Sequence, residues 1–188
     1  HDVGVIKMEV SRNVEPEEGF LECVRNIATE NNIVLIFDEC TSGFRETLGG
    51  LHKKYKVYPD IAIFAKALGN GYAISACIGR QKIMQAAQKT FISSTFWTER
   101  IGSTAGLKTL EVMERERSWE NITEIGNSIS KQWQALANKY NISINTWGLP
   151  ALSGYTFDLS NNLEYKTLVT QEMLKKGYLA TNSVYVCT

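Results

Sequence analysis

The chain has 188 residues, 44% of them hydrophobic, and its 20 basic residues balance its 20 acidic ones. Because the formal charge is zero and the basic residues are scattered, the sequence argues against a nucleic acid or a membrane as partner. No apolar stretch approaches the ~20 residues of a membrane span and no signal-peptide pattern opens the chain, so we expect one or two globular domains with a sizeable core.

The first half of the chain predicts strands that alternate with helices, which is the pattern of an α/β layer. The predicted elements are, in order, a strand at 3–9, a helix starting within 15–18, a strand at 33–37, a glycine-rich loop at 41–50, a short helix at 51–56, strands at 61–65 and 74–78, and a helix at 81–88. The helix start rests on a proline and three acidic residues, which suit a first turn.

The second half predicts longer helices and a smaller sheet. The predicted elements are a helical stretch over most of 101–140, strands at 142–147 and 152–159, a helix at 163–176 and an extended end at 178–186. Ser118 is a suitable N-cap and would break the long helical stretch there. Gly177 suits the position just after the last helix.

Two of the predicted strands end in ionisable residues. Asp38 directly follows the run Ile33–Phe37, and Lys66 directly follows the run Ile61–Ala65. Short apolar runs of this kind indicate buried parallel strands, and ligands bind beyond the carboxyl ends of such strands. An aspartate there can also be a simple turn residue, and a lysine can be merely solvated. The apolar neighbours of Lys66 favour chemistry, because an apolar setting disfavours the charged amine and makes it a nucleophile.

These residues stand within a longer pattern that resembles the class III aminotransferases. The similar segments are Leu35-Ile36-Phe37-Asp38-Glu39-Cys40-Thr41-Ser42-Gly43-Phe44-Arg45, Leu48-Gly49-Gly50, Tyr58-Pro59-Asp60-Ile61, Lys66-Ala67-Leu68-Gly69-Asn70-Gly71 and Ile78-Gly79-Arg80. The Gly-Phe-Arg followed by Leu-Gly-Gly is most similar to the glutamate-1-semialdehyde aminomutase branch. The resemblance implies an α/β fold of type I, with a mixed, mostly parallel sheet and a smaller α+β C-terminal domain.

The resemblance also implies a pyridoxal 5'-phosphate (PLP) enzyme, an aminotransferase or a 2,1-aminomutase. Lys66 would form the internal Schiff base and move the proton, and Asp38 would pair with the pyridine nitrogen of the cofactor. Cys40 would lie against the ring as a small hydrophobe. Thr95, in Ser93-Ser94-Thr95-Phe96, would donate to the cofactor phosphate of a neighbouring subunit, so the resemblance implies a homodimer with a small-molecule substrate. The substrate itself is left open.

The chain also resembles only the second half of such an enzyme, because it begins with His1 in place of a methionine and enters directly on a strand. We expect residues 1–116 to be the second half of the PLP-binding domain and residues 117–188 to be a small domain. The four cysteines form no CxxC pair and there are only two histidines, which predicts reduced cytoplasmic thiols and no metal site.

Two other functions stay open at this point. The chain alone could be a non-catalytic fragment, since a phosphate loop and a ring-stacking aromatic of the family's first half are absent from it. The same fold and cofactor could also serve racemisation or decarboxylation, because the electron-accepting PLP ring supports these two reactions as well as amino transfer.

Overall fold

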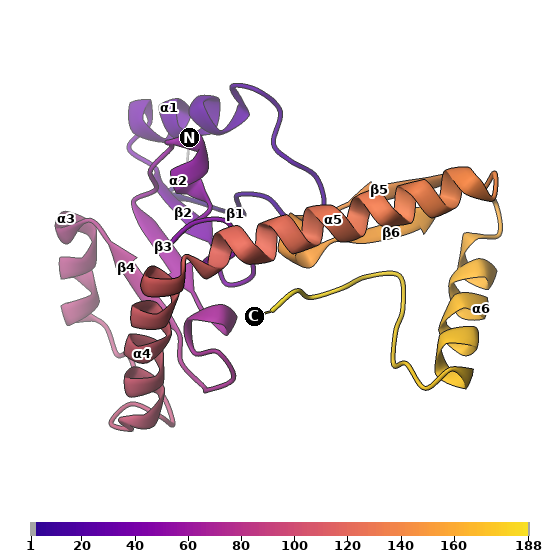
Figure 1. Ribbon diagram of the computed structural model, residues 1–188. Coiled ribbons are helices and arrows are strands. Elements are labelled where there is room, and N and C mark those ends of the chain that lie inside the picture. The colour runs from indigo at the N-terminus through magenta and orange to yellow at the C-terminus, as the bar shows by residue number, and fades with distance from the viewer. Residues whose placement is uncertain (1–2, 188) are drawn as a thin grey trace. The chain divides into compact units, whose positions relative to one another are not determined.

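A computed structural model describes residues 3–187. The chain forms two compact units, one ending at Trp119 and the other beginning at Glu120. We call them unit 1 and unit 2. Figure 1 shows the elements of both. The predicted domain change between residues 116 and 117 stays a prediction.

Unit 1 is built on a four-stranded sheet in the order β1-β2-β3-β4. Its strands are β1 (Val5–Glu9), β2 (Val34–Asp38), β3 (Ile61–Phe64) and β4 (Ala76–Gly79). The first three strands are parallel, and β4 pairs antiparallel with β3. The sheet is therefore mixed and mostly parallel, as the family resemblance implies.

The register of the parallel strands decides which side chains share a face. Lys7 of β1 aligns with Ile36 of β2, and Asp38 aligns with Ile63 of β3. Successive side chains alternate between faces, so Lys7 and Asp38 lie on the same face. The opposite face of β2 carries Leu35 and Phe37, both with no exposed surface. At β2 the sheet therefore has one fully buried face and one half-buried face, and the half-buried face carries the charged Asp38.

Helices and short turns connect the strands of unit 1. They are α1 (Phe20–Glu30), α2 (His52–Tyr55), η1 (Lys66–Leu68), α3 (Gln81–Met84), η2 (Gln85–Lys89) and α4 (Ile101–Glu116). Helix α1 packs on β2 and buries Leu21 and Ala28. A second cluster joins Phe64 of β3 to Met113 of α4. The core thus anchors the strand ends that carry Asp38 and Lys66.

Two details of the predicted helices are wrong. Helix α1 begins at Phe20 rather than within 15–18, because Gly19 adopts a left-handed conformation (φ 79°) and forms a turn with Glu18. The break in the long helical stretch is at Arg117, whose φ of 49° ends α4, and Ser118 is already the first residue of α5 (Ser118–Lys139).

Unit 2 combines α5 with a two-stranded antiparallel sheet. Strands β5 (Ile144–Trp147) and β6 (Gly154–Phe157) flank the 3-10 turn η3 (Pro150–Leu152), and helix α6 (Asn162–Lys175) follows. A small core joins Ile122 of α5 to Ala151 and Val186. Figure 1 shows the hairpin running along α5 within this unit.

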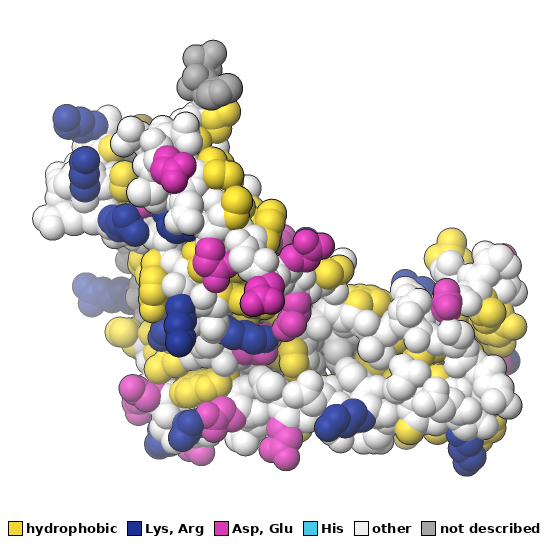
Figure 2. Space-filling model, turned by 90° about the horizontal axis from the view of Figure 1, so that it is seen from above, with side chains coloured by type: hydrophobic (Ala, Val, Ile, Leu, Met, Phe, Trp, Pro, Cys, Tyr) yellow, Lys and Arg dark blue, Asp and Glu magenta, His cyan; other side chains and the backbone are white. Residues whose placement is uncertain are grey.

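Charges of both signs are intermixed with hydrophobic side chains over the face of the molecule drawn in Figure 2, in keeping with the zero formal charge. Among residues 3–187, no helix is both long and apolar enough to cross a membrane.

Candidate active site

Asp38 is the last residue of β2, at the carboxyl end of the parallel strands. Its Oδ2 accepts a hydrogen bond from Lys7 Nζ at 2.8 Å, and its Oδ1 accepts one from the backbone amide of Cys40 at 3.2 Å. The hydrogen bond from Lys7 lowers the pKa of Asp38 to about 2, against the opposing effect of partial burial. At neutral pH Asp38 is therefore a carboxylate that can hold a cation or a protonated nitrogen.

Lys66 follows β3 and opens the short turn η1. Its backbone is left-handed, with a φ of 47°, a conformation that costs a non-glycine residue about 1–2 kcal/mol. Its Nζ donates a hydrogen bond to Thr41 Oγ1 at 2.8 Å. Residues held in such a conformation gather at active sites.

The sequence predicts an apolar environment for the Lys66 amine, and the structure differs from this prediction. The apolar neighbours Phe64 and Leu68 are buried in the core, whereas Lys66 itself is exposed. The sharp turn at Lys66 separates the amine from these neighbours, because it directs the side chain away from the core that they enter. The amine is consequently accessible to a ligand and is positioned by Thr41.

Cys40 interacts electrostatically with both predicted catalytic groups, Asp38 and Lys66. Burial raises the pKa of the Cys40 thiol, and the nearby Asp38 raises it further through a hydrogen bond and its negative charge. The positive charges of Lys66 and Lys7 act in the opposite direction. The Cys40 thiol therefore senses both Asp38 and Lys66. The structure brings these three predicted residues together.

Thr95 is the fourth predicted site residue. It is exposed on a turn at residues 95–98. Within residues 3–187, no hydrogen bond or ion pair links Thr95 to Asp38, Cys40 or Lys66. The structure gives Thr95 no contact with the other three predicted site residues, and its role as a phosphate ligand stays a prediction.

Two residues at the site, Lys7 and Thr41, are absent from the sequence prediction. Lys7 is the only charge within the apolar run Val5–Met8, and a single charge inside a predicted buried strand is a signal that could have singled it out. Thr41 opens the glycine-rich loop three residues after Asp38. Nothing in its local pattern distinguishes it from an ordinary loop residue.

Glu39 holds that loop in place. Its side chain has no exposed surface, and it accepts hydrogen bonds from Leu51 N (2.7 Å), His52 N (2.9 Å), His52 Nδ1 (2.7 Å) and Ser42 Oγ (2.8 Å). Burial alone would raise the pKa of Glu39, but the hydrogen bonds from His52, Leu51 and Ser42 outweigh it and lower the pKa. Glu39 therefore ties the loop that carries Thr41 to the end of β2.

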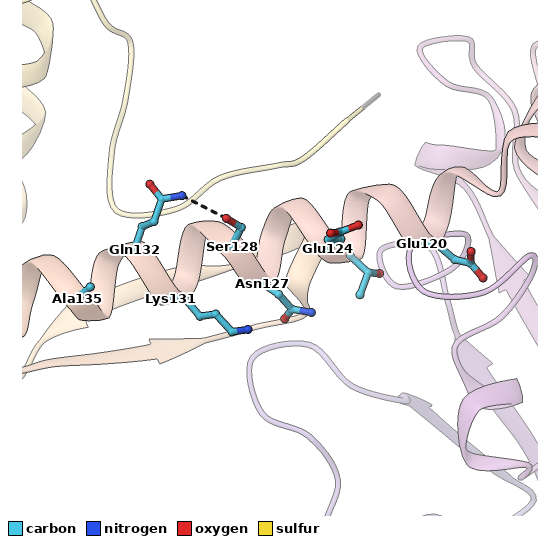
Figure 3. Close-up of a pocket in the computed structure, with 8 residues that line it drawn as sticks. Glu120, Glu124, Asn127, Ser128, Lys131, Gln132 and Ala135 are labelled. Carbon is cyan, nitrogen blue, oxygen red and sulfur yellow. Dashed lines mark hydrogen bonds between the residues drawn. The ribbon is translucent and has the colours of Figure 1, made fainter.

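Two surface hollows are lined by other residues. One, of about 740 Å³, runs along α5 between Glu120 and Ala135 and is shown in Figure 3, where Gln132 donates to Ser128. Because a single helix lines it, it is an open groove. The other, of about 270 Å³, is lined by Arg25, Lys56 and Arg80 among others. Neither hollow is lined by a predicted site residue.

The part of the chain that the structure describes holds no cluster of three or more His, Cys, Asp or Glu side chains placed to bind a metal ion. Its four cysteines are free thiols.

Comparison with known proteins supports a family for the chain. The pattern of the family described as Aminotransferase class-III matches residues 13–185. A 3-aminobutyryl-CoA aminotransferase from Cloacimonas acidaminovorans is 38% identical over 157 residues, which cover 83% of this chain and 38% of that protein. A glutamate-1-semialdehyde 2,1-aminomutase from Methanocaldococcus jannaschii is 30% identical, over 92% of this chain and 43% of that protein. The chain thus spans about two fifths of the length of these relatives.

Solved structures share the fold at lower identity. A β-phenylalanine aminotransferase from Variovorax paradoxus matches with a TM-score of 0.86 and 21% identity, over the whole of this chain and 48% of that one. The FumI protein of Sphingopyxis sp. MTA144, solved in its PLP internal aldimine form, matches with a TM-score of 0.88 and 20% identity, over 99% of this chain and 45% of that one. With a family pattern that spans nearly all of its residues, this chain belongs to the class III aminotransferases.

Proposed function

We propose that this chain is the part of a PLP-dependent aminotransferase or aminomutase that carries the reactive lysine, Lys66. The observation that supports this best is an accessible amine and a carboxylate ionised at neutral pH, placed beyond two adjacent parallel strands. Lys66 supplies the amine and Asp38 the carboxylate, with Cys40 within electrostatic reach of both. Asp38 and Lys66 do not pair with each other, because Asp38 accepts from Lys7 and Lys66 donates to Thr41.

The residues present fit this cofactor. When bound, PLP supplies an aldehyde that bonds to an amine and a ring that accepts electrons from the substrate's α-carbon. Lys66 Nζ would carry the covalent attachment, and Asp38 would hold a proton on the ring nitrogen. Lys66 Nζ would also be the base that takes the substrate's α-proton and returns it to a carbon atom of the substrate. The Thr41 hydroxyl, 2.8 Å from Nζ, would orient the amine for both tasks.

The choice between amino transfer to a second substrate and transfer within one substrate stays open. The named relatives include one aminotransferase and one aminomutase, and the residues described here do not distinguish between the two reactions. We therefore propose the shared chemistry, amino-group transfer on a small molecule.

Borohydride reduction tests the proposal on the natural protein that carries this sequence. After treatment with PLP and borohydride, peptide mapping should find a pyridoxyl group on Lys66. The variant Lys66→Arg should lack it, and Lys108→Arg, at an exposed lysine paired with Glu111, should keep it. A pyridoxyl group on another lysine, or on none, would show that Lys66 is not the attachment site.

We further propose that the protein works as a homodimer in which Thr95 binds the cofactor phosphate of the neighbouring subunit. Thr95 lies in a segment of exposed apolar side chains that includes Phe91 (94% exposed) and Trp97 (65% exposed). Apolar surface of this kind marks protein interfaces, and a hydroxyl is a suitable phosphate ligand.

Subunit mixing tests this arrangement. If Lys66 and Thr95 of one site come from different subunits, Lys66→Ala and Thr95→Val proteins should each bind PLP poorly. Mixed after reversible dissociation, they should form heterodimers with one intact site and regain PLP binding. No recovery in verified heterodimers would refute the crossed arrangement, and a monomer in light scattering would refute the dimer.

We also propose a cytoplasmic location, supported by the four free thiols, which suit a reducing compartment. Cell fractionation with a membrane-impermeant maleimide tests it, and labelling before lysis would contradict it.

A further inference from the structure

The function proposed above assigns no role to Lys7, which forms an ion pair with Asp38. Lys7 Nζ lies 2.8 Å from Asp38 Oδ2, and the two side chains are 55% and 24% exposed. The pair joins neighbouring strands on the half-buried face of the sheet, at the edge where Lys66 also lies. Asp38 is the carboxylate that the proposed cofactor ring would need, and Lys7 already binds it.

Both oxygens of Asp38 are engaged in this arrangement. Lys7 occupies Oδ2, and the Cys40 amide donates to Oδ1. The Cys40 amide is backbone at the end of β2 and cannot leave without unfolding the turn. Lys7 is different, because it is a flexible, exposed side chain that can move its ammonium group into water at little cost. Of the two contacts, only the one made by Lys7 is replaceable.

We propose that Lys7 is a positioning residue that stands in for the protonated ring nitrogen of PLP at Asp38 and competes with it when the cofactor binds. This inference rests on the proposed function. Without cofactor, the Lys7 ammonium neutralises Asp38 and fixes its orientation. With cofactor, two cations would share or contest one carboxylate, so Asp38 would hold the ring nitrogen less firmly than an unpaired aspartate would.

The charges around the pair support this direction. The hydrogen bond and positive charge of Lys7 lower the proton affinity of Asp38, and the Cys40 thiol and amide act in the same sense. Asp38 in turn raises the pKa of Lys7, with a smaller contribution from Glu9. Lys7 is therefore a full cation at neutral pH, and its removal leaves Asp38 ionised but without a mobile partner.

Pyridoxamine 5'-phosphate is the probe that isolates this contact. It has the same ring nitrogen as PLP but carries an amine in place of the aldehyde, so it cannot bond covalently to Lys66. Its binding to the natural protein therefore reports on Asp38 and Lys7 without contribution from Lys66 attachment. Fluorescence titration gives its Kd, and NMR of the ring-¹⁵N-labelled compound reports whether the nitrogen is protonated.

We expect Lys7→Met to bind pyridoxamine phosphate about two- to fivefold more tightly than wild type, which is the range that an exposed ion pair contributes. Its ring nitrogen should also keep its proton to a higher pH. Lys7→Arg should behave like wild type. Lys108→Met, which breaks a similarly exposed ion pair on α4, should leave the Kd unchanged.

A double-mutant cycle assigns the effect to Asp38. In an Asp38→Asn background, Lys7→Met should change neither the Kd nor the ring-nitrogen protonation, since the contested carboxylate is gone. Equal or weaker binding by Lys7→Met, or the same gain in the Asp38→Asn background, would overturn the inference. If borohydride still marks Lys66 while Lys7→Met has no effect, only this inference fails. If wild type binds neither compound, both proposals fail.

Discussion

The substitution Glu39→Gln tests whether the candidate site depends on a buried carboxylate. Glu39 is fully buried and accepts four hydrogen bonds, two on each oxygen, at 2.7–2.9 Å. Glutamine has nearly the same shape but only one acceptor oxygen, so its NH₂ group must face donors on one side. Four groups donate to the Glu39 carboxylate, and two of them, the backbone amides of Leu51 and His52, cannot turn away without moving the loop.

The expected loss follows from these contacts. A hydrogen bond to a charged group contributes about 1.5–3 kcal/mol, and a buried donor left unsatisfied costs about 1–3 kcal/mol. With the His52 ring free to change tautomer and accept from the new NH₂ group, we expect Glu39→Gln to lower the free energy of unfolding by about 2–4 kcal/mol. At a typical slope of about 2 kcal/mol per molar urea, the midpoint should fall by about 1–2 M.

The pH dependence of stability should also show the contribution of Glu39. The pKa of Glu39 is lowered in the folded protein, so its stabilisation is present above its ordinary value near 4.5 and is lost as the pH falls below that value. Glu39→Gln should therefore flatten the decline of stability in this acid range.

Urea unfolding followed by far-UV circular dichroism measures the midpoint, and hydrogen exchange of the Leu51 and His52 amides measures the loop directly. The control is Glu22→Gln, at an exposed position in the first turn of α1, which should change stability by less than about 0.5 kcal/mol. A Glu39→Gln midpoint within the range of this control, with unchanged amide exchange, would refute the role assigned to Glu39.

Three further predictions concern neighbouring positions. Thr41→Val removes the acceptor of the Lys66 amine and should slow covalent attachment of PLP about tenfold while Thr41→Ser keeps it, as stopped-flow absorbance would show; equal rates would contradict the positioning role. Gly43→Ala would place a Cβ 2.7 Å from a backbone carbonyl and should cost about 1–3 kcal/mol in urea unfolding, whereas Gly4→Ala, with open space around it, should cost under about 1 kcal/mol; similar losses would refute the steric argument. Burial alone would raise the pKa of Asp60, but hydrogen bonds from a backbone amide and an arginine outweigh it and lower the pKa, so stability should fall as the pH drops below about 4. Asp60→Asn should remove that fall and cost about 1–3 kcal/mol at pH 7; an unaltered acid limb would contradict this.

The sequence predicts those features of this chain that depend on local pattern. Short apolar runs predict β2 and β3, and the rule that ligands lie beyond the carboxyl ends of parallel strands brings Asp38 and Lys66 to one edge. The start of α1 was missed because acidic residues and proline suit a turn as well as a first helical turn, and the left-handed Gly19 decides between them.

Features that depend on the register between strands could not be predicted. The Lys7–Asp38 pair exists because Lys7 and Asp38 project from the same face of adjacent strands that are distant in sequence. The exposure of Lys66 was missed for a related reason, since apolar neighbours along the chain say nothing of where the backbone turns. The bond between Lys66 and Thr41 likewise requires the loop geometry that Glu39 imposes.

The left-handed backbone at Lys66 has a practical consequence for engineering. Glycine would occupy this conformation without steric cost, so a stabilisation scheme guided by backbone preference would select position 66 early and replace the lysine. The resulting protein would be expected to have a higher melting temperature and to lack the Lys66 amine. Position 66 should therefore be held fixed when thermostable versions of this chain are designed.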